Sequence, residues 1–331
     1  MDSQKFEAAV NTIHQLKSGI EAVIKGKSET IKLLLTALIA DGHVLLEDYP
    51  GSGKTTLTKT LGGLISKDQS SLEEIAAYRR IQFTPDMLPG DVLGVNIFEQ
   101  ATGRFRFSAG PVFAQIVLAD EINRTSPKVQ AAFLECMAEK QVTIDGSTHK
   151  LDDLFFVVGT QNPIDIAGTY PLPIVQLDRF LLKLPMSYAD AATELTILQE
   201  AELIKSNLSQ LHPVCSRSEV LAARAVAESV RIHPAIQQAA VAIAQASRKH
   251  PATMYGISTR GLIMFQSALR ALALVAGRNF VNEDDFRELL PFVFLHRMKF
   301  HPGSGKPAEL LNEICEPELE KMIRTRLDQE T

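Results

Sequence analysis

The sequence contains no tryptophan and few cysteines. Its 331 residues include three cysteines, which lie far apart in the chain and form no Cys-x-x-Cys pair. A zinc ribbon and a dithiol redox motif both need such pairs, so the spacing excludes them. A sparse and odd number of cysteines suits a reducing compartment better than a disulfide-stapled secreted domain.

Long apolar runs and an excess of basic charge are also lacking. The longest apolar stretches, such as Ile31–Ala40, are shorter than the ~20 residues that cross a bilayer. The N-terminal residues Met1–Glu7 are too polar for a signal peptide, so we expect a cytoplasmic protein without membrane insertion. The 34 basic and 39 acidic residues give a net charge of −5. A dedicated nucleic-acid binder usually carries an excess of basic charge, which this chain lacks.

What the chain does contain is an alternation of helical and strand-like segments in its first two-thirds. Apolar residues at helical spacing predict a helix in Ile31–Ala40, and a short buried strand follows in His43–Glu47. A helix in Thr55–Ile65 and strands at Ile116–Ala119 and Phe155–Gly159 are also predicted. Strands that alternate with helices favour a parallel sheet covered by helices, so the predicted fold class is α/β.

Two β-hairpins are predicted within this region. Each consists of two alternating segments around a glycine-containing turn, and Asp-Gly is a strong signal for a two-residue turn. The hairpins are either exposed decoration or elements that line a pore or contact a partner. The paired segments are Val95–Phe98 with Arg104–Phe107, and Gln141–Ile144 with Ser147–Leu151 around Asp145-Gly146.

Beyond about Tyr188 the strand signal stops and alanine-rich helical segments follow. We therefore expect two domains. Residues 1–188 would form an α/β domain that includes an N-terminal helix, and residues 189–331 would form a smaller all-α domain. Asn207–Ser216, which contains a proline and scattered polar residues, is predicted to be a linker. The predicted helices are Ala189–Ser206, Arg217–Arg231, Pro234–Lys249, Thr259–Ala276 and Asn282–Leu295.

The strongest signal is a phosphate-binding loop between a predicted strand and a predicted helix. The pattern G-x-x-x-x-G-K-[ST] is matched by Gly53, Lys54 and Thr55, while Asp48 stands at its first position in place of glycine. Glycines let such a loop curl so that its N–H groups and the helix N-terminus face an anion. Lys54 would then reach the β and γ phosphates of a nucleotide, and Thr55 would bind Mg²⁺. The residues expected to hold the nucleotide here are Pro50, Gly51, Ser52, Gly53, Lys54, Thr55 and Thr56.

A second motif is a hydrophobic strand that ends in two acids. Ile116–Ala119 is followed by Asp120 and Glu121, as in a Walker B element. Ligands bind at the carboxyl ends of strands in open α/β sheets. Asp120 would hold Mg²⁺, and Glu121 would orient or deprotonate the attacking water. A kinase or a switch needs only one carboxylate, so the second acid favours hydrolysis.

Three further polar residues each leave two interpretations open. Asn162, after the strand at Phe155–Gly159, is either a sensor of the γ phosphate or an ordinary turn residue. Arg179 either forms a local ion pair with Asp178 or reaches a neighbouring subunit's phosphate, an effect worth roughly 10³ to 10⁵ in rate. Arg260 is either a nucleotide-contacting residue or a solvated cation in the first turn of a helix.

Taken in order, these segments resemble the MoxR family of AAA+ ATPases over most of the chain, from about Ile24 to Met298. The resemblance implies a P-loop AAA+ core of three αβα layers, with an insert at helix 2 near Pro85–Pro111, followed by a small all-α lid. The matching strings are LLEDYPGSGKTTL, RIQFTPDMLPGDVLG, FSAGPVFAQIVLADEINRTSPKVQAAFLECMAEKQVTIDG, VVGTQNPIDIAGTYPLPIVQLDRFLLK and YGISTRG.

The resemblance also implies a role for each matching position. Val23, Ile24 and Gly26 match the segment that packs on adenine. Arg124 fits the pattern as a second candidate for the arginine that acts across a subunit interface. By position, Lys54 and Thr55 belong to Walker A, Asp120 and Glu121 to Walker B, Asn162 to sensor 1, Arg179 to the arginine finger and Arg260 to sensor 2.

The function implied by the resemblance is a Mg²⁺-dependent ATP hydrolase that remodels or matures protein partners in a chaperone-like way. Its active site would be completed between the subunits of a homo-oligomer, typically a hexameric ring, and its partner would contain a von Willebrand factor A domain. Two alternatives remain open. One is a nucleic-acid-acting AAA+ ATPase, for which Arg104 and Arg106 are the local hint. The other is a nucleotide-binding switch without turnover, which the intact Lys54, Asp120 and Glu121 disfavour.

Overall fold

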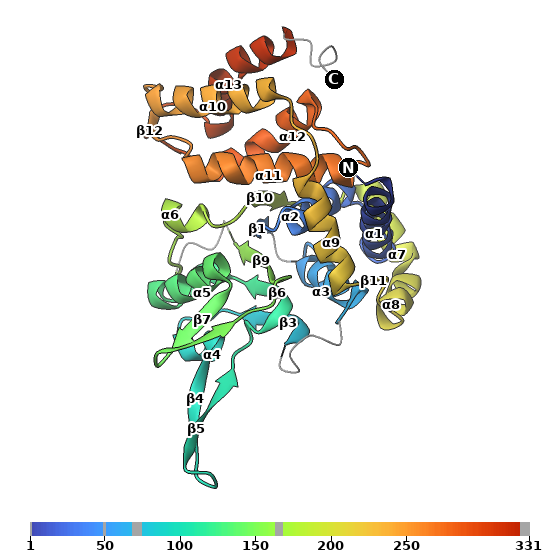
Figure 1. Cartoon of the computed structure of the whole chain (residues 1–331), viewed down its shortest axis with the longest axis vertical. Coiled ribbons are helices and arrows are strands. Elements are labelled where there is room, and N and C mark those ends of the chain that lie inside the picture. Colours follow the sequence, from blue (N-terminus) through green and yellow to red (C-terminus); the bar gives the residue numbers. More distant parts are fainter. Residues whose placement is uncertain (1, 49–50, 68–74, 163–167, 325–331) are drawn as a thin grey trace.

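A five-stranded parallel sheet forms the centre of the molecule (Figure 1). The computed structural model describes residues 2–48, 51–67, 75–162 and 168–324. Every pair of neighbouring strands runs parallel, as the alternation of strands and helices predicted. The order across the sheet is β10 (Leu182–Met186), β1 (Val44–Asp48), β9 (Phe156–Gln161), β6 (Ala114–Asp120) and β3 (Ala76–Gln82). The three predicted strands are thus β1, β6 and β9, whereas β3 and β10 were not predicted.

Helices cover both faces of this sheet. Successive side chains of a strand point to opposite faces, and the neighbours Leu45 and Leu46 accordingly belong to two different apolar clusters. The cluster around Leu46 includes residues of α1 (Ser3–Glu21), α2 (Ser28–Ile39) and α3 (Lys54–Leu64), and the cluster around Leu45 includes residues of α5 (Pro127–Glu139). The three-layer αβα core is therefore confirmed, and α2 and α3 confirm the two helices predicted beside the phosphate loop.

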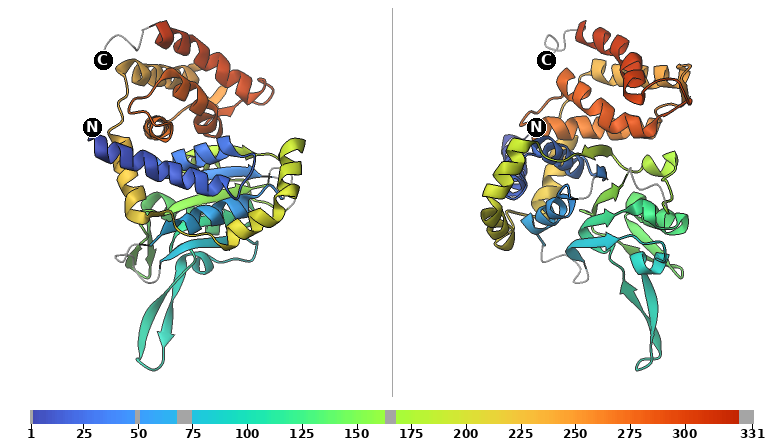
Figure 2. Two further views of the ribbon diagram at one scale, coloured as in Figure 1. Left: turned by 90° about the vertical axis from the view of Figure 1, so that its right-hand side faces the viewer. Right: turned by 180° about the vertical axis from the view of Figure 1, so that it is seen from behind.

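Both predicted β-hairpins are present, and the longer one projects away from the sheet and the helices (Figures 1 and 2). In the shorter one, Asp145 and Gly146 have φ values of 48° and 79°, the left-handed values that a two-residue hairpin turn needs. A hydrogen bond of 2.8 Å from Asn96 Nδ2 to Asp145 Oδ2 connects the two hairpins. The strands are β4 (Gly94–Glu99) and β5 (Arg104–Ala109), which follow the short helix α4 (Pro89–Leu93), and β7 (Gln141–Ile144) and β8 (Ser147–Lys150).

The C-terminal half is mainly helical, as predicted, but some boundaries differ. The helix predicted at Ala189–Ser206 is two helices, because Glu200 leaves helical geometry with φ −96° and ψ 9°. None of the helices in the described ranges is long and apolar enough to span a bilayer. The helices are α7 (Ala191–Gln199), α8 (Ala201–Ser209), α9 (Arg217–Glu228), α10 (Pro234–Lys249), α11 (Thr259–Val275), α12 (Glu283–Phe294), the 3₁₀ turn η2 (Leu295–Arg297) and α13 (Pro307–Arg324).

The expectation that strands end at Tyr188 is wrong. β12 (Thr253–Tyr255) pairs with β13 (Lys299–Phe300), and β11 (Cys215–Ser216) pairs with β2 (Ile65–Ser66) in the other half of the chain. Strands of two or three residues are too short to show the alternation by which a strand is detected in a sequence. β11 and the last turn of α8 also occupy the two ends of the predicted linker Asn207–Ser216.

The apolar core continues across the predicted domain boundary after Tyr188. α9 packs against α1 and α2 within one cluster of buried residues. Its Arg224 donates to the carbonyl of Leu38 at 2.9 Å and forms an ion pair with Asp41. The division into residues 1–188 and 189–331 stays a prediction, and α9 lies beside the first of these two parts.

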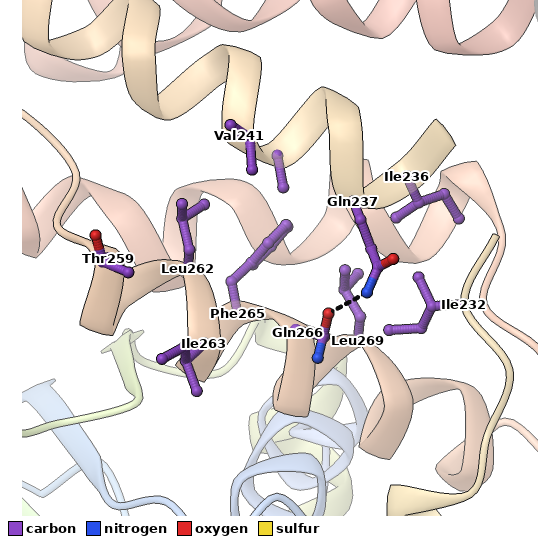
Figure 3. Close-up of a pocket in the computed structure, with 11 residues that line it drawn as sticks. Ile232, Ile236, Gln237, Val241, Thr259, Leu262, Ile263, Phe265, Gln266 and Leu269 are labelled. Carbon is purple, nitrogen blue, oxygen red and sulfur yellow. Dashed lines mark hydrogen bonds between the residues drawn. The ribbon is translucent and has the colours of Figure 1, made fainter. Parts of the chain in front are cut away.

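α10 and α11 line an apolar pocket in the upper, helical part of the molecule (Figure 3). Its volume is about 290 Å³, and its lining includes no charged side chain. Gln237 donates a hydrogen bond of 2.6 Å to Gln266 at its rim. A pocket without charged groups does not suit a triphosphate, so this pocket is not the nucleotide site that the sequence predicts.

His43, just before β1, is a buried histidine whose tautomer is fixed by its neighbours. The N–H of Val157 donates to Nδ1 at 3.1 Å, and Nε2 lies 3.2 Å from the carbonyl oxygen of Met137. A backbone N–H can only donate and a carbonyl can only accept, so the ring is neutral with its proton on Nε2. Burial lowers the pKa of His43 from 6.5 to about 4, and the Met137 carbonyl opposes this only in part.

We predict that His43 makes the fold sensitive to acid. Below pH 6.5 the unfolded chain takes up a proton at this position while the folded chain does not until about pH 4. This lowers the free energy of unfolding by up to about 3 kcal/mol as the pH falls through that window. The variant His43→Gln lacks this term, so its stability deficit relative to the wild type, measured by denaturant titration, should shrink from neutral pH to about pH 4. A deficit that stays constant with pH contradicts the prediction.

Candidate active site

The predicted phosphate loop leads from β1 into α3. Gly51 and Gly53 have φ values of +84° and +94°, which only glycine adopts without strain. Nothing lies within 4 Å of a Cβ built on either residue, so the backbone conformation and not crowding requires glycine here. Gly53 is the N-cap of α3 and Lys54 its first residue, so the first N–H groups of this helix face the loop. The position predicted at Pro50 lies outside the described residues.

The ammonium group of Lys54 lies against the first acid of the Walker B strand. Lys54 Nζ is 3.2 Å from Asp120 Oδ1, and the side chain of Asp120 is only 2% exposed. The hydroxyl of Thr160 donates to the same oxygen at 2.7 Å. Arg80 donates to Oδ2 from Nη2 at 2.6 Å and from Nε at 3.2 Å. One buried carboxylate therefore connects α3, β6, β9 and β3.

The charge of Asp120 is stabilised by these partners. Burial raises the pKa of Asp120, but the hydrogen bonds from Arg80 and Thr160 and the charge of Lys54 outweigh it and hold the pKa below its usual range. The carboxylate is therefore ionised at neutral pH and available as a metal ligand. The register of the sheet explains the assembly, because Gln82 of β3 lies opposite Asp120 and β9 lies on the other side of β6.

Glu121, the second acid, lies in a strained turn directly after β6. Its φ of 57° and ψ of 48° are left-handed values, which cost a non-glycine residue roughly 1–2 kcal/mol. Its backbone N–H donates to the Thr160 hydroxyl at 2.9 Å, so Thr160 contacts both acids. The carboxylate accepts a hydrogen bond from Gln82 Nε2 at 2.8 Å and lies 3.2 Å from Arg124 Nε. Strain of this kind persists where the surroundings over-determine it, and active sites are where such residues cluster.

Sequence analysis did not identify Arg80, Gln82 and Thr160 as part of this group. All three lie at or near the carboxyl end of a strand adjacent to β6. Thr160 could have been found as a polar residue two positions before Asn162 in a buried strand. No comparable signal marks Arg80 and Gln82, because β3 itself was not predicted.

The remaining predicted polar residues are distributed differently. Asn162 follows β9, which lies between β1 and β6 in the sheet. Arg124 lies in the 3₁₀ turn Ile122–Arg124 and contacts Glu121 of its own chain. Arg179 instead follows α6 (Ile174–Leu177) and donates to the carbonyl of Leu134 in α5.

Arg260 is exposed in the first turn of α11, where the sequence placed it. Ser258 is the N-cap of this helix and accepts a hydrogen bond from the N–H of Gly261 at 3.0 Å. Within the described ranges, neither Arg260 nor Arg179 forms a hydrogen bond or ion pair with Lys54, Asp120 or Glu121 of the same chain. Their predicted roles therefore depend on a bound nucleotide or on a second chain.

The segment predicted to pack on adenine joins α1 to α2. Val23 and Ile24 are buried, at 3% and 8% exposure. Gly26 has a φ of +68°, and a Cβ there would lie 2.4 Å from Thr193 Cγ2 of α7, so both conformation and packing demand glycine. Ion pairing between Lys25 and Glu200 at 3.1 Å fixes the segment to the start of α8. The contact with adenine stays a prediction.

The residues present fit a magnesium ion bound together with phosphate. Thr55 lies in the first turn of α3, next to Lys54, and Asp120 supplies an ionised carboxylate. In the described part of the chain, no three His, Cys, Asp or Glu side chains come together as a self-sufficient metal site. Mg²⁺ usually binds through one or two carboxylates together with substrate phosphates, which is the donor set that this loop provides. Thr56 lies in the same helical turn and adds a further backbone N–H.

Comparisons with known proteins agree with this site. Residues 43–182 match the family model of the "ATPase family associated with various cellular activities (AAA)", and residues 245–314 match an AAA lid domain. The uncharacterized protein YeaC of Bacillus subtilis is 46% identical over 86% of this chain and 85% of its own. Chaperone MoxR1 of Mycobacterium tuberculosis is 34% identical over 89% of this chain and 78% of its own.

A solved structure extends the likeness to the fold. The crystal structure of a candidate ATPase from Cytophaga hutchinsonii superposes with a TM-score of 0.84 at 33% identity, covering 95% of this chain and 96% of the other. The two matching domains, the parallel sheet and the helical lid agree with the predicted AAA+ architecture. With the acids of β6 beside a phosphate loop and such relatives, the chain belongs to the MoxR family of AAA+ ATPases.

Proposed function

We propose that this AAA+ protein is a Mg²⁺-dependent ATP hydrolase that remodels or matures protein partners, with each active site completed by an arginine of the next subunit. The observation that supports it most directly is the contact of Lys54 with the buried Asp120 at 3.2 Å, next to the glycine loop. This contact brings a phosphate-binding cation and a metal-binding anion to one point.

The residues act in an order that the geometry suggests. The loop N–H groups and the N-terminus of α3 bind the phosphates, and Lys54 turns from Asp120 toward the phosphate oxygens. Thr55 and Asp120 hold Mg²⁺, which neutralises charge on the phosphate when it is bound. Glu121 exchanges its contact with Gln82 or Arg124 for a water molecule, orients it and accepts its proton at a carboxylate oxygen. Asn162, at the end of β9, contacts the γ phosphate or this water.

The arginine from the neighbouring subunit is Arg179 in this proposal. Arg124 forms an ion pair with Glu121 of its own chain, and we assign it a role in cis on that ground. Arg179 uses one of its five N–H groups for the Leu134 carbonyl, and a guanidinium retains further donors for a phosphate. Arg260 of the lid contacts the nucleotide from the same chain.

The expected partner is a protein, and we propose one that contains a von Willebrand factor A domain. The likeness to a protein named a chaperone supports this class of activity. The projecting β4–β5 hairpin adds two aromatic side chains, Phe98 and Phe105, that are 52% and 71% exposed and suit contact with a polypeptide. We propose a hexameric ring in the cytoplasm as the working assembly.

Glu121→Gln should separate binding from hydrolysis. We predict that phosphate release falls about 10²- to 10⁴-fold, since the general base is lost, while ATP binding remains. The exposed Glu135→Gln on α5 is the matched control and should retain wild-type turnover. Unchanged turnover of Glu121→Gln would refute the role of this residue, and ATP binding without phosphate release in the wild type would indicate a switch.

Mixing experiments should identify the arginine that acts in trans. We predict that Arg179→Ala lowers kcat about 10³-fold or more. A mixture of Arg179→Ala with Lys54→Ala should recover activity, because the second variant still supplies Arg179 to its neighbour. Arg124→Ala should not be rescued in this way, since Arg124 contacts Glu121 of the same chain. Rescue of Arg124→Ala and not of Arg179→Ala reverses the assignment.

Thr160→Val tests the residue that contacts both acids. The variant keeps the shape of the side chain and removes the hydrogen bonds to Asp120 and Glu121. We predict a loss of about 10- to 100-fold in turnover, with a higher Mg²⁺ concentration needed for half-maximal rate. Thr160→Ser, which keeps the hydroxyl, and the exposed Thr148→Val should both stay near the wild type. An unchanged Mg²⁺ dependence of Thr160→Val contradicts the assignment.

A further inference from the structure

Arg297 lies in η2 of the lid. Among the arginines that form ion pairs in the described residues, its side chain is the most deeply buried, with 1% exposure. Its guanidinium contacts the 178–181 segment at four points. Nε donates to Asp178 Oδ1 at 2.8 Å, and Nη2 approaches the carbonyl oxygen of the same residue at 3.3 Å. Nη2 also donates to the Phe180 carbonyl at 2.6 Å, and Nη1 donates to the Leu181 carbonyl at 3.1 Å.

These contacts lie on both sides of Arg179. Asp178 precedes Arg179 in the chain, and Phe180 and Leu181 follow it. A second lid residue, His296, strengthens the attachment, since its Nε2 lies 3.0 Å from the Phe180 carbonyl oxygen. The backbone from which the arginine finger projects is therefore attached to the lid of its own subunit.

On the lid side, Arg297 is equally fixed. It donates to the Val293 carbonyl and lies 2.7 Å from His296 Nε2 and 3.2 Å from Met264 Sδ. The first turn of α11 packs on it, because a Cβ built on Gly261 would lie 3.1 Å from Arg297 Cδ. Gly261 directly follows Arg260, the lid residue expected to contact the nucleotide.

The ion pair carries a cost that a purely apolar contact would avoid. Burial lowers the pKa of Arg297 to about 10, Asp178 opposes this, and the charge of Arg260 lowers it further, so the guanidinium stays charged at neutral pH. A buried charge is costly unless its hydrogen bonds are satisfied, and here a set of carbonyls and one carboxylate satisfies them.

Next to this attachment the lid and the segment are separated by a cleft. It has a volume of about 830 Å³ and lies between residues 171–178 on one side and lid residues such as Ser258 and Met298 on the other. Arg297 and Asp178 both line it, so their ion pair bridges lid and segment beside open space. Arg297 is therefore placed where a change in the position of the lid would reach this segment.

We propose that Arg297 is a positioning residue for Arg179, through which the lid of one subunit sets the placement of the arginine that serves the next subunit's ATP. The inference rests on the proposed trans role of Arg179. It predicts that a defect at Arg297 impairs the neighbouring pocket and leaves the pocket of its own subunit intact. A merely structural role of Arg297 in the lid would impair its own pocket, where Arg260 acts.

The experiment uses the full chain in mixed assemblies. Arg297→Lys keeps the charge, but a single ammonium group cannot reproduce the fork of donors that reaches Asp178, Phe180 and Leu181. We expect kcat to fall about 10- to 100-fold, as for a misplaced catalytic group, with KM for ATP changed less than about twofold. The Lys54→Ala variant has an inactive nucleotide pocket but retains Arg179. Mixed with it, Arg297→Lys should regain activity as Arg179→Ala does.

The matched control is Arg278→Lys. Arg278 forms another arginine–aspartate pair of the lid, with Asp285, and its hydrogen bonds go to Asp285 and to the carbonyl of Phe280, not to the 178–181 segment. It should therefore keep its turnover and show no gain on mixing. Thermal melts of each variant monitor folding. If Arg297→Lys does not fold, Asp178→Ala is tested in its place, because Asp178 is 20% exposed and lies outside the lid.

The outcomes are distinct. Rescue of Arg179→Ala together with a lack of rescue of a folded Arg297→Lys or Asp178→Ala overturns the positioning role and leaves the trans arginine in place. Wild-type turnover of these variants overturns it as well. If Arg179→Ala itself is not rescued by Lys54→Ala, the proposed trans function fails, and the inference built on it fails with it.

Discussion

The site depends on one buried anion, the carboxylate of Asp120. An ionised carboxylate with 2% exposure is tolerated only where cations and hydrogen-bond donors surround it, and here they come from three other elements. Lys54 begins α3, Arg80 belongs to β3 and Thr160 belongs to β9. Satisfying this single charge therefore fixes the helix after the phosphate loop relative to three adjacent strands.

In the proposed mechanism, nucleotide binding would have to change some of these contacts of Asp120. Lys54 cannot give its full attraction to Asp120 and to phosphate oxygens at the same time, so phosphate competes with Asp120 for it. Arg80 donates to the other oxygen, Oδ2, and in the proposed mechanism it would keep the carboxylate in place when Lys54 turns to the phosphate. Glu121 is likewise bound by Gln82 and Arg124, and its side chain is 24% exposed. In this structure both acids and Lys54 are thus held by protein partners, which a substrate would replace in the proposed mechanism.

The sequence predicted those parts of the molecule whose signal is local. The glycine loop, the strand that ends in two acids and the Asp145-Gly146 hairpin depend on a few consecutive residues, and all three are present. The sequence did not predict β3 and β10, because both are edge strands of the sheet and lack the pattern of a buried strand. β3 exposes two arginines in a row, and β10 contains Pro185, which an edge strand tolerates and a central strand does not.

The residues that bind the two acids were not predicted for a related reason. Thr160, Arg80 and Gln82 reach the two acids only through the register of neighbouring strands, which single-strand patterns do not contain. Arg297 is the extreme case, because a charged residue between histidine and methionine near the C-terminal end suggests a solvated surface. Its burial comes from contacts with the 178–181 segment, which is distant in sequence, and with other lid residues.

The loop that carries Arg179 is held at both of its described ends by buried side chains. At one end, Gln130 of α5 donates to the carbonyl oxygens of Tyr170, at 2.9 Å, and of Ile122, at 3.2 Å, in the turn that follows Glu121. At the other end, Arg297 connects the loop to the lid. The loop is thus attached to two parts of its own subunit, the turn after Glu121 and the lid, which contact the nucleotide in the proposed mechanism. If Arg179 acts on the next subunit's ATP as we propose, its placement would depend on both attachments, because the loop that carries it is bonded to α5 at one described end and to the lid at the other.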